Sequence, residues 1–543
     1  MLPILLLTFA ATIDIYPGDP IFDTLKALKP GDEAIIHAGT YDVPGYVNLQ
    51  LAGTVDQPIV IRGADGEVAV IQGIPNQNAI NIEGSHYTFK NLEIVGGSHG
   101  VRVGTSAHAT FEDLLIRESG DVGLSCNRPM NTYEDITIRR VHIRDTGKSG
   151  GPGECMYLGC NNGDCKLWGS LVEFNLCHDT LSGSQGDGIE LKTGSYDTII
   201  RHNVVYNVNF PGITAYGTQG MPPNTIEGNV VWNVVDNGIQ LVGDAIVRNN
   251  LVFDVGASGI AAKPSQGEIV KDLAVVHNTV IGAGDTCFRG NEFPAGGADI
   301  VVANNAFFCA ATSAIKLPQG LGQAVFAANA VQGAVAGPVQ GATIDGQSLA
   351  ASFLDAAAMN VYPAGGAPLI DAGDPQHAVA DDFNCLPRDG APDIGAYGHS
   401  TPDNPGWLVQ PDFKQCAQQG GTGTDTDTDT DGTGGGGGST TDATTGEPGG
   451  TDSGAPTSGG PGGGTDEPPT TDGATGQVPG DSTAGTSDGP ATGDAPGTGS
   501  AGDTDTAGMT EAAGCGCDAD GGPAPGGLLA LLAVLGLRRR RMA

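Results

Sequence analysis

Short β-rich runs that end in asparagine recur along this chain and restrict the folds open to it. From Asn203 onward, successive members of the set lie 26, 21, 28, 27 and 24 residues apart. The runs end at Asn91, Asn203, Asn229, Asn250, Asn278, Asn305 and Asn329. A second short run and a Gly-apolar step follow most of them, as at Gly188-Ile189 and Gly212-Ile213. Since no helical periodicity separates these segments, βαβ units are excluded, and the repeat predicts the coils of a parallel β-helix.

The recurrent asparagine is the residue expected at a stacked bend of such a coil. Its amide can hydrogen-bond to the rungs above and below, and it tolerates a left-handed backbone. Leucine-rich repeats have a similar period, but the leucine spacing that defines them is absent. We therefore predict an all-β solenoid of about ten rungs between residues 60 and 335, with a thin core of Val, Ile and Ala. Such a core agrees with an aromatic content of only 5%.

Glycine and acidic residues are concentrated after the repeats. Of the 88 glycines in 543 residues, 29 lie in residues 417–514, together with 16 acids and no Lys, Arg or aromatic residue. Such a stretch cannot bury enough apolar surface to order itself. We predict a β-helix domain over residues 13–400 and a mostly disordered Thr/Asp/Gly/Pro linker over residues 401–514. Residues 1–416 keep a formal charge of −23, which excludes binding of nucleic acid by charge alone.

The last residues, 515–543, have the order of a sorting signal. Cys515 and Cys517 precede a ten-residue apolar run, which the block Arg538–Arg541 closes. Ten residues span about 15 Å as a helix, half of a bilayer core of about 30 Å. This order closely resembles the myxobacterial C-terminal sorting tag, the MYXO-CTERM family. The resemblance implies cleavage by a processing protease near Cys515 or Cys517, membrane contact only through this segment, and a location on the bacterial cell surface.

The N-terminus and the cysteines also indicate secretion. Residues 1–12 begin with an apolar run that ends in small residues, as a truncated signal peptide does, and the true start lies either here or upstream. Nine cysteines fall within residues 1–416, five of them between Cys126 and Cys177. We expect disulfides in an oxidising compartment with one thiol left over, and the spacing leaves their connectivity open. A zinc site is the alternative, although neither a Cys-x-x-Cys pair nor a His-x-x-x-His pair accompanies Cys160 and Cys165.

The body of the chain resembles the right-handed parallel β-helix superfamily of pectate-lyase-like proteins. The segments that carry the resemblance over roughly residues 13–400 are Gly18–Asp32, Gly39–Tyr41, Pro58–Gly63, Pro368–Gly373 and Pro392–Tyr397. They are similar to the N-terminal cap, the first rung and the closing segment of that superfamily. The resemblance implies the fold but not one activity, because this fold hosts lyases, hydrolases, epimerases and non-catalytic surface proteins.

Alignment of the rungs on their Gly-apolar steps predicts two outward-facing columns of side chains. The first column reads Arg102, Ser125, Tyr157, Glu190, Thr214 and Gln240, and the second reads Gly104, Asn127, Gly159, Lys192, Tyr216 and Val242. Because rungs stack about 4.8 Å apart, the polar members form one patch roughly 15 Å long. Its rings, amides and charged pair suit a sugar chain, with Tyr157, Asn127 and Gln240 as the predicted substrate-binding residues.

If the protein cleaves a uronate polymer by elimination, the residues of this patch can be assigned catalytic roles. Lys192 with a lowered pKa would be the base, Tyr216 the acid, and Glu190 the third catalytic residue. Asp187 and Glu154, with Glu190, would hold Ca²⁺, which favours several oxygen ligands and would bridge an acidic body to a polyanion.

The run Glu190-Leu-Lys-Thr-Gly-Ser195 is similar to the segment that carries the catalytic lysine in chondroitinase-B-like and alginate-lyase relatives. Those enzymes place an arginine on the following rung, whereas Ile213–Gly217 contains none. The simpler interpretation of Glu190 and Lys192 is a solvated ion pair.

Two functions therefore remain open. The first is a secreted, surface-anchored β-helix that acts on or binds polysaccharide, in its most specific form a Ca²⁺-assisted lyase of acidic polysaccharide. The alternative is a non-catalytic adhesin or carbohydrate-binding surface protein. A polygalacturonase-like hydrolase is disfavoured, because the paired aspartates Asp381 and Asp382 lie beyond the rungs.

Overall fold

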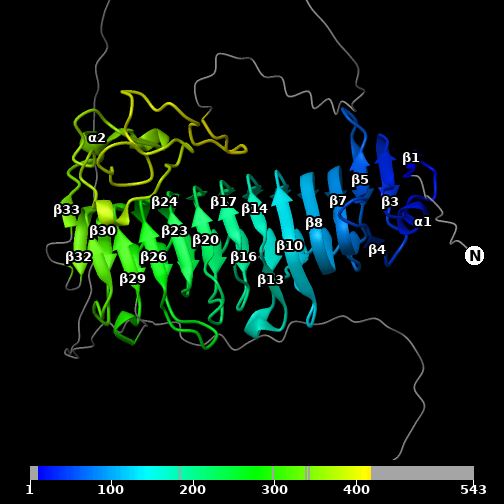
Figure 1. Ribbon diagram of the computed structural model, residues 1–543, viewed down its shortest axis with the longest axis horizontal. Helices are drawn as coiled ribbons and strands as arrows, with labels where there is room; N and C mark the ends of the chain where they lie inside the picture. Colours follow the sequence, from blue (N-terminus) through cyan, green and yellow to red (C-terminus); the bar gives the residue numbers. More distant parts are fainter. Residues whose placement is uncertain are drawn as a thin grey trace, which may run out of the picture. The chain divides into compact units, whose positions relative to one another are not determined.

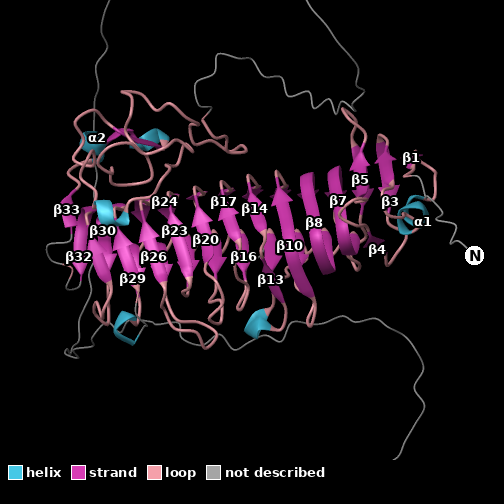
Figure 2. Cartoon of the chain, viewed as in Figure 1, coloured by secondary structure: helices cyan, strands magenta, loops and turns pink. Residues whose placement is uncertain are grey.

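Parallel strands stacked in three sheets build the body of the protein (Figures 1 and 2). The computed structural model describes residues 10–181, 183, 185–295, 299–336, 339 and 343–417. The predicted linker from residue 418, the C-terminal tag and most of the predicted signal peptide lie outside these residues. Within them, no helix is long and apolar enough to cross a lipid bilayer.

Each turn of the coil contributes one strand to each sheet. The first sheet contains β4 (Asn48–Ala52), β7 (Ile80–Val95), β8 (Val101–Arg117), β9 (Leu124–Cys126), β12 (Met156–Leu158), β16 (Ile189–Leu191), β19 (Ile213–Ala215), β22 (Ile239–Leu241), β25 (Ser258–Ala262), β28 (Thr286–Gly290), β30 (Ala306–Lys316) and β32 (Asn329–Ala336). The second sheet contains β1 (Thr12–Ile15), β2 (Glu33–Ile36), β5 (Ile59–Gly63), parts of β7 and β8, β10 (Thr132–Arg139), β14 (Leu171–Glu173), β17 (Ile199–Arg201), β20 (Asn224–Glu227), β23 (Ala245–Arg248), β26 (Leu273–Val276), β29 (Ile300–Ala303) and β31 (Val325–Ala327).

The third sheet completes the turn. It contains β3 (Gly39–Asp42), β6 (Ala69–Gln72), parts of β7 and β8, β11 (His142–Arg144), β15 (Leu176–His178), β18 (Val204–Tyr206), β21 (Val230–Trp232), β24 (Leu251–Val255), β27 (Thr279–Ala283), parts of β30 and β32, and β33 (Thr343–Asp345). The short strand β13 (Lys166–Trp168) also pairs with β10. Helix α1 (Ile21–Lys26) buries Ile21, Phe22 and Leu25 near the first rungs.

The strand register confirms a solenoid of about the predicted length. One position of the first sheet is joined from rung to rung through ten residues: Asn81, Arg102, Ser125, Tyr157, Glu190, Thr214, Gln240, Ala261, Arg289 and Lys316. The core between the sheets is mainly aliphatic, as expected.

The glycine of the Gly-apolar step is required by close packing at a corner. A Cβ atom on Gly212 would lie 2.3 Å from Cγ1 of Val231 and 2.8 Å from the carbonyl oxygen of Gly238. No real Cβ tolerates the first contact, so a side chain here would push the rungs apart. The same crowding recurs at Gly188, Gly238 and Gly259, which explains why the step repeats in the sequence.

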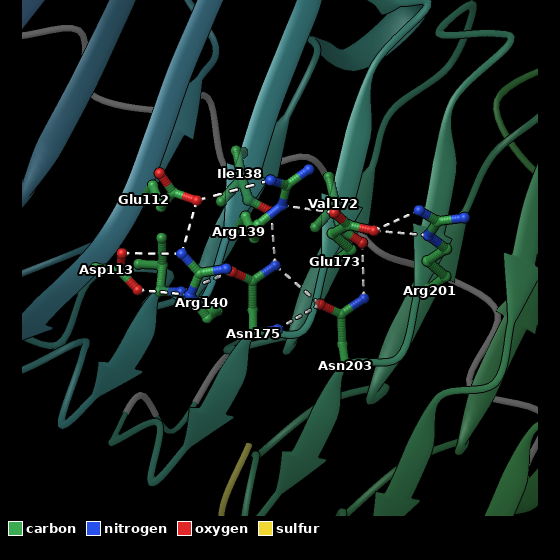
Figure 3. Close-up of polar contacts among 11 residues, drawn as sticks. Glu112, Asp113, Ile138, Arg139, Arg140, Val172, Glu173, Asn175, Arg201 and Asn203 are labelled. Carbon is green, nitrogen blue, oxygen red and sulfur yellow. Dashed lines mark hydrogen bonds and ion pairs between the residues drawn. The ribbon is translucent and has the colours of Figure 1, made fainter. Parts of the chain in front are cut away.

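A ladder of buried asparagines runs between the second and third sheets, as predicted, except that Asn175 belongs to it and Asn91 does not. Asn91 has a φ of 54° and donates to the carbonyl oxygens of Gly63 and Ala64. The ladder comprises Asn175, Asn203, Asn229, Asn250, Asn278, Asn305 and Asn329. Each side-chain amide donates to the Oδ1 atom of the next member at 2.9–3.0 Å, and each backbone N–H donates to the same oxygen at 2.9–3.1 Å. Figure 3 shows the first pair, Asn175 and Asn203.

The left-handed backbone conformation expected for these asparagines belongs instead to the residue before each of them. His202, Asn249 and His277 have φ of 57°, 55° and 55°, whereas the ladder asparagines that follow them do not have positive φ. The preceding residue makes the bend, and this leaves the ladder residue free to point its amide inward.

A charged ladder lies beside the asparagines. Arg139 and Arg201 each contact Glu173 at 2.6 Å from opposite sides (Figure 3). Glu173 is only 3% exposed, so two guanidinium groups neutralise one buried carboxylate. This alternation of charge lets acidic and basic side chains stack at the strand spacing without repulsion.

Eight of the nine cysteines predicted to lie in the domain are paired, which confirms the expectation of disulfides with one thiol left over. The bridges join Cys155 to Cys177, Cys160 to Cys165, Cys287 to Cys309 and Cys385 to Cys416. The remaining thiol, Cys126, is buried. Because Cys160 and Cys165 are bonded to each other, the alternative of a zinc site at this pair does not apply.

A closing segment follows the last rungs and packs on the outer side of the third sheet. It contains α2 (Leu349–Ser352), the antiparallel pair β34 (Phe353–Asp355) and β35 (Asn360–Pro363), and short 3₁₀ turns at Ala356–Ala358 and Pro375–His377. Two further 3₁₀ turns, Asn161–Gly163 and Phe293–Ala295, lie in loops between rungs. Packing continues beyond residue 400, because Trp407 and Lys414 are buried. Nζ of Lys414 donates to Nδ1 of His202 at 2.8 Å, and burial lowers the pKa of this lysine to about 7.

We predict that Asn250→Ala lowers the free energy of unfolding by at least about 3 kcal/mol, because it leaves several buried polar groups without a hydrogen-bond partner. Chemical denaturation would measure the loss. Asn131→Ala is the matched control, because Asn131 accepts from Thr105 and donates to the carbonyl oxygen of Pro129 in an exposed turn, without a positive φ. The control should change stability by no more than about 0.5 kcal/mol. Equal losses in both variants would contradict a stabilising role for the buried ladder.

Candidate functional site

The first predicted column is confirmed by the strand register. Arg102, Ser125, Tyr157, Glu190, Thr214 and Gln240 are directly paired from rung to rung in the first sheet. Lys192 and Tyr216 follow β16 and β19, and their backbone N–H groups donate to Leu158 and Leu191 of the preceding rung. The structure therefore brings Tyr157, Glu190, Lys192 and Tyr216 together, as the alignment of Gly-apolar steps predicted.

Glu190 and Lys192 form an ion pair, but the prediction that this pair is solvated is wrong. Oε1 of Glu190 lies 2.5 Å from Nζ of Lys192. The two residues are only 4% and 6% exposed. Loops that follow the neighbouring strands cover this corner of the coil, so Thr193 beside Lys192 is also buried.

Two tyrosine rings flank the lysine. Nζ of Lys192 lies 4.5 Å from the ring centroid of Tyr157 and 5.1 Å from that of Tyr216, within the range of cation–π attraction. The hydroxyl of Tyr216 donates to Oε1 of Glu190 at 3.4 Å. Burial raises the pKa of Tyr157 to about 12, and burial with the charge of Glu190 raises the pKa of Tyr216, so both phenols keep their protons at neutral pH.

The predicted lowering of the Lys192 pKa is not found. Burial alone would lower it, but the charge of Glu190 and the two tyrosines raise the pKa of Lys192 above its ordinary value. The lysine is therefore a buried cation in this structure. Sequence reasoning anticipated neither the burial of Lys192 nor the short contact with Glu190 that outweighs the effect of burial on its pKa.

Three carboxylates meet beside this pair. Glu154, Asp187 and Glu190 each place an oxygen within 4.8 Å of the others. Asp187 accepts a hydrogen bond from Oγ1 of Thr214 at 2.8 Å. Both carboxylate oxygens of Glu154 are buried and have no hydrogen-bond partner. Burial and the charge of Glu190 raise the pKa of Glu154 and Asp187 well above their ordinary values.

The carboxylate of Glu154, which has no hydrogen-bond partner, indicates whether these residues suit a metal ion. A buried ionised carboxylate without a partner is costly, and either a proton or a cation removes the cost. Three converging carboxylates are the oxygen donors that Ca²⁺ favours. Glu154, Asp187 and Glu190 therefore fit a hard divalent cation.

The other predicted binding residues lie at the two ends of this patch. Oδ1 of Asn127 accepts from Nε of Arg102 at 3.2 Å, one rung before Tyr157. Gln240 accepts from Asn237 at 3.0 Å, two rungs after Glu190, and is 9% exposed. Both are held by neighbours on the same face. Cys515 and Cys517, predicted for processing, lie outside the described residues.

Sequence reasoning missed His99 and Asp121, which lie on the two rungs before Tyr157. Oγ of Ser125 contacts Nδ1 of His99 at 2.9 Å, and Nε2 of His99 lies 3.6 Å from Oδ2 of Asp121. Burial and nearby arginines lower the pKa of His99 to about 3, which leaves the ring neutral. Burial raises the pKa of Asp121, whose charge in turn raises that of Glu154. A signal was present, since Glu154 and Asp187 stand directly before the Gly-apolar position of successive rungs and Asp121 stands two residues before it on the preceding rung.

Comparison with known proteins agrees with this architecture. The family described as "Right handed beta helix region" matches residues 78–245 and 170–307. The fold is a right-handed parallel β-helix. Pectate lyase PEL9 of Emericella nidulans is 23% identical over 157 residues, which cover 26% of this chain. The match spans only 38% of the length of that fungal protein.

Two solved polysaccharide lyases match this chain in the structural comparison. Pectate lyase Pel9A is 16% identical with a TM-score of 0.45, over 72% of this chain and 97% of that one. An alginate lyase from Paenibacillus sp. is 19% identical with a TM-score of 0.37, over 60% of this chain and 99% of that one.

We predict that the metal-free protein loses stability as the pH rises from about 5 to 8. The folded pKa of Glu154 and Asp187 lies above the unfolded one, so over this interval the folded state holds more protons and stability falls with pH. Glu154→Gln should flatten this slope in chelator, as measured by denaturation at several pH values. Glu134→Gln, which replaces an exposed carboxylate, should keep the wild-type slope. Identical slopes in all three proteins would contradict repulsion among the buried carboxylates.

Proposed function

We propose that this protein acts on an acidic polysaccharide at the first sheet and cleaves it by elimination with the help of Ca²⁺. The observation that carries the proposal is a buried lysine held between two tyrosine rings, beside three converging carboxylates. A buried ion pair, two rings and the unpartnered carboxylate of Glu154 lie together here, and perturbed titratable groups of this kind cluster at functional sites. The similarity to pectate and alginate lyases supports the same class of substrate.

Elimination requires three operations on the uronate. Its carboxylate must be neutralised, the proton on the adjacent carbon removed, and the departing glycosidic oxygen protonated. The electron pair of the broken C–H bond forms a C=C bond as the C–O bond breaks. Lys192 would remove the proton and Tyr216, which keeps its phenolic proton, would supply one to the oxygen.

The charge of Glu190 holds Lys192 protonated, so Lys192 acts as a base only when that charge is offset. With Glu190 neutralised, burial would dominate and would lower the pKa of the lysine. Glu154, Asp187 and Glu190 would hold the cation, which also supplies positive charge for the substrate carboxylate when bound. This meets a second need, because a body of charge −23 repels a polyanion.

A product assay tests the lyase. We expect wild type with Ca²⁺ to form an unsaturated product, detected by ultraviolet absorbance, on at least one member of a panel of uronate polymers. Lys192→Ala and Tyr216→Phe should lower kcat about 10²- to 10⁴-fold, the usual contribution of a general base or acid. Lys148→Ala is the control, since Lys148 pairs with Glu118 at the surface, and it should keep full activity.

The alternative is a carbohydrate-binding surface protein without catalysis. It is favoured by the cationic state of Lys192 and by the absence of arginine in residues 213–217, where the lyases that the sequence resembles carry one. The same polymer panel separates the two functions. Glycan binding with no product on any polymer would overturn the lyase and support the binding protein.

We also propose that the protein is secreted and displayed at the bacterial cell surface after a protease removes the C-terminal tag. Four disulfides in the described residues support an oxidising compartment. Mass spectrometry of the protein from its native cells should find a mature C-terminus near Cys515 or Cys517. An intact Arg538–Arg541 block in the surface fraction would refute the processing.

A further inference from the structure

A hairpin after β25 reaches back toward the Lys192 corner from later rungs. Ser265 and Glu268 form an antiparallel bridge, and the two residues between them, Gln266 and Gly267, have φ of 48° and 80°. Positive φ at both central positions is the signature of a tight two-residue hairpin turn. The turn places the side chain of Gln266 at the tip.

The amide of Gln266 contacts residues from two other rungs through both its oxygen and its nitrogen. Its Oε1 atom accepts the backbone N–H of Asn162 at 2.9 Å and the hydroxyl of Thr193 at 2.7 Å. Its Nε2 atom donates to Oδ1 of Asn161 at 3.1 Å. Thr193 directly follows Lys192, and the asparagines follow the strand of Tyr157. Since β25 is four rungs beyond β12, the hairpin spans roughly 19 Å along the stack, from the rung of β25 back to the loop after β12.

Glycines seat the hairpin on the rungs that it crosses. Gly217 follows Tyr216, and a Cβ on it would lie 2.9 Å from Cγ of Glu268. Gly243 is the equivalent residue one rung later, and a Cβ on it would lie 2.8 Å from the carbonyl oxygen of Lys271. Side chains at either position would lift the hairpin off the corner. The glycines and Gln266 thus act together in holding it down.

The contact point on the other side is itself rigid. Asn161 and Asn162 lie in a short loop closed by the disulfide between Cys160 and Cys165. The tip of the hairpin is therefore fixed to a cross-linked loop, and the corner beneath it is buried, with Thr193 only 1% exposed.

We propose that Gln266 is a positioning residue of the candidate site, contributed by a hairpin outside the rungs that carry the chemistry. Its amide holds the hairpin over the corner that follows Lys192. In this position the hairpin covers Lys192 and forms one side of the proposed glycan path. The proposal rests on the proposed function for its glycan, but the contact made by Gln266, here called the latch, can be tested without any substrate.

Amine-reactive labelling of Lys192, followed by peptide mass spectrometry, reports whether the corner is covered. We expect Gln266→Ala to raise the labelling rate of Lys192 roughly 5- to 30-fold, because the latch loses all three hydrogen bonds. Gln266→Glu keeps the accepting oxygen for Asn162 and Thr193 and should restore most of the protection. Gln319→Ala is the matched control, since Gln319 accepts the backbone N–H of Glu292 between two later loops. It should leave Lys192 as protected as in the wild type.

The outcomes separate the latch from the proposed function. Unchanged labelling of Lys192 in Gln266→Ala would overturn the latch, even if wild type proves to be a lyase. Raised labelling with rescue by Gln266→Glu would establish it, even if no polymer is cleaved. On a polymer that is cleaved, Gln266→Ala should raise KM more than it lowers kcat, and an equal loss in kcat with unchanged KM would contradict a role in holding the glycan path.

Discussion

Hydrogen bonds between stacked parallel strands fix the spacing at which every side chain of this solenoid repeats. Each rung can satisfy its backbone only through the rungs above and below, so residues at equivalent positions are held about 4.8 Å apart. Side chains at equivalent positions of successive rungs therefore contact one another. In the second sheet the result is an alternation of arginine and glutamate around Glu173, and at the bend it is a continuous line of amides. In the first sheet it is a set of carboxylates that repel one another.

That repulsion distinguishes the candidate site from the other ladders. Glu173 is buried between two arginines, whereas Glu154 has no hydrogen-bond partner and has Asp187 and Glu190 beside it. Lys192 balances only one of the three acids. The charges do not alternate here as they do one sheet away, and either protons or a bound cation would relieve the resulting cost.

The sequence allowed the periodic part of this structure to be predicted and little of the rest. The asparagine ladder and the column through Tyr157, Glu190 and Gln240 follow from a repeat that can be aligned on its Gly-apolar steps. The burial of Lys192 could not be predicted, because it depends on loops that differ from rung to rung in length and composition. The contact of Gln266 with Thr193, 73 residues away, is of this kind. Disulfide pairing was open for the same reason, as only folding brings the cysteines together.

The asparagine ladder also has a direction. Every amide points its oxygen toward the preceding rung and its nitrogen toward the next, so the seven side-chain dipoles add along the axis of the solenoid. Aligned hydrogen-bonded amides polarise one another, as peptide groups do in a helix. One end is electronegative and is capped by the N–H of Val141, which donates to Asn175. The other end is electropositive, and the Asn329 amide there donates to the carbonyl oxygen of Val302 on the preceding rung. The fold thus carries an internal electrical polarity that neither its net charge nor its surface reveals.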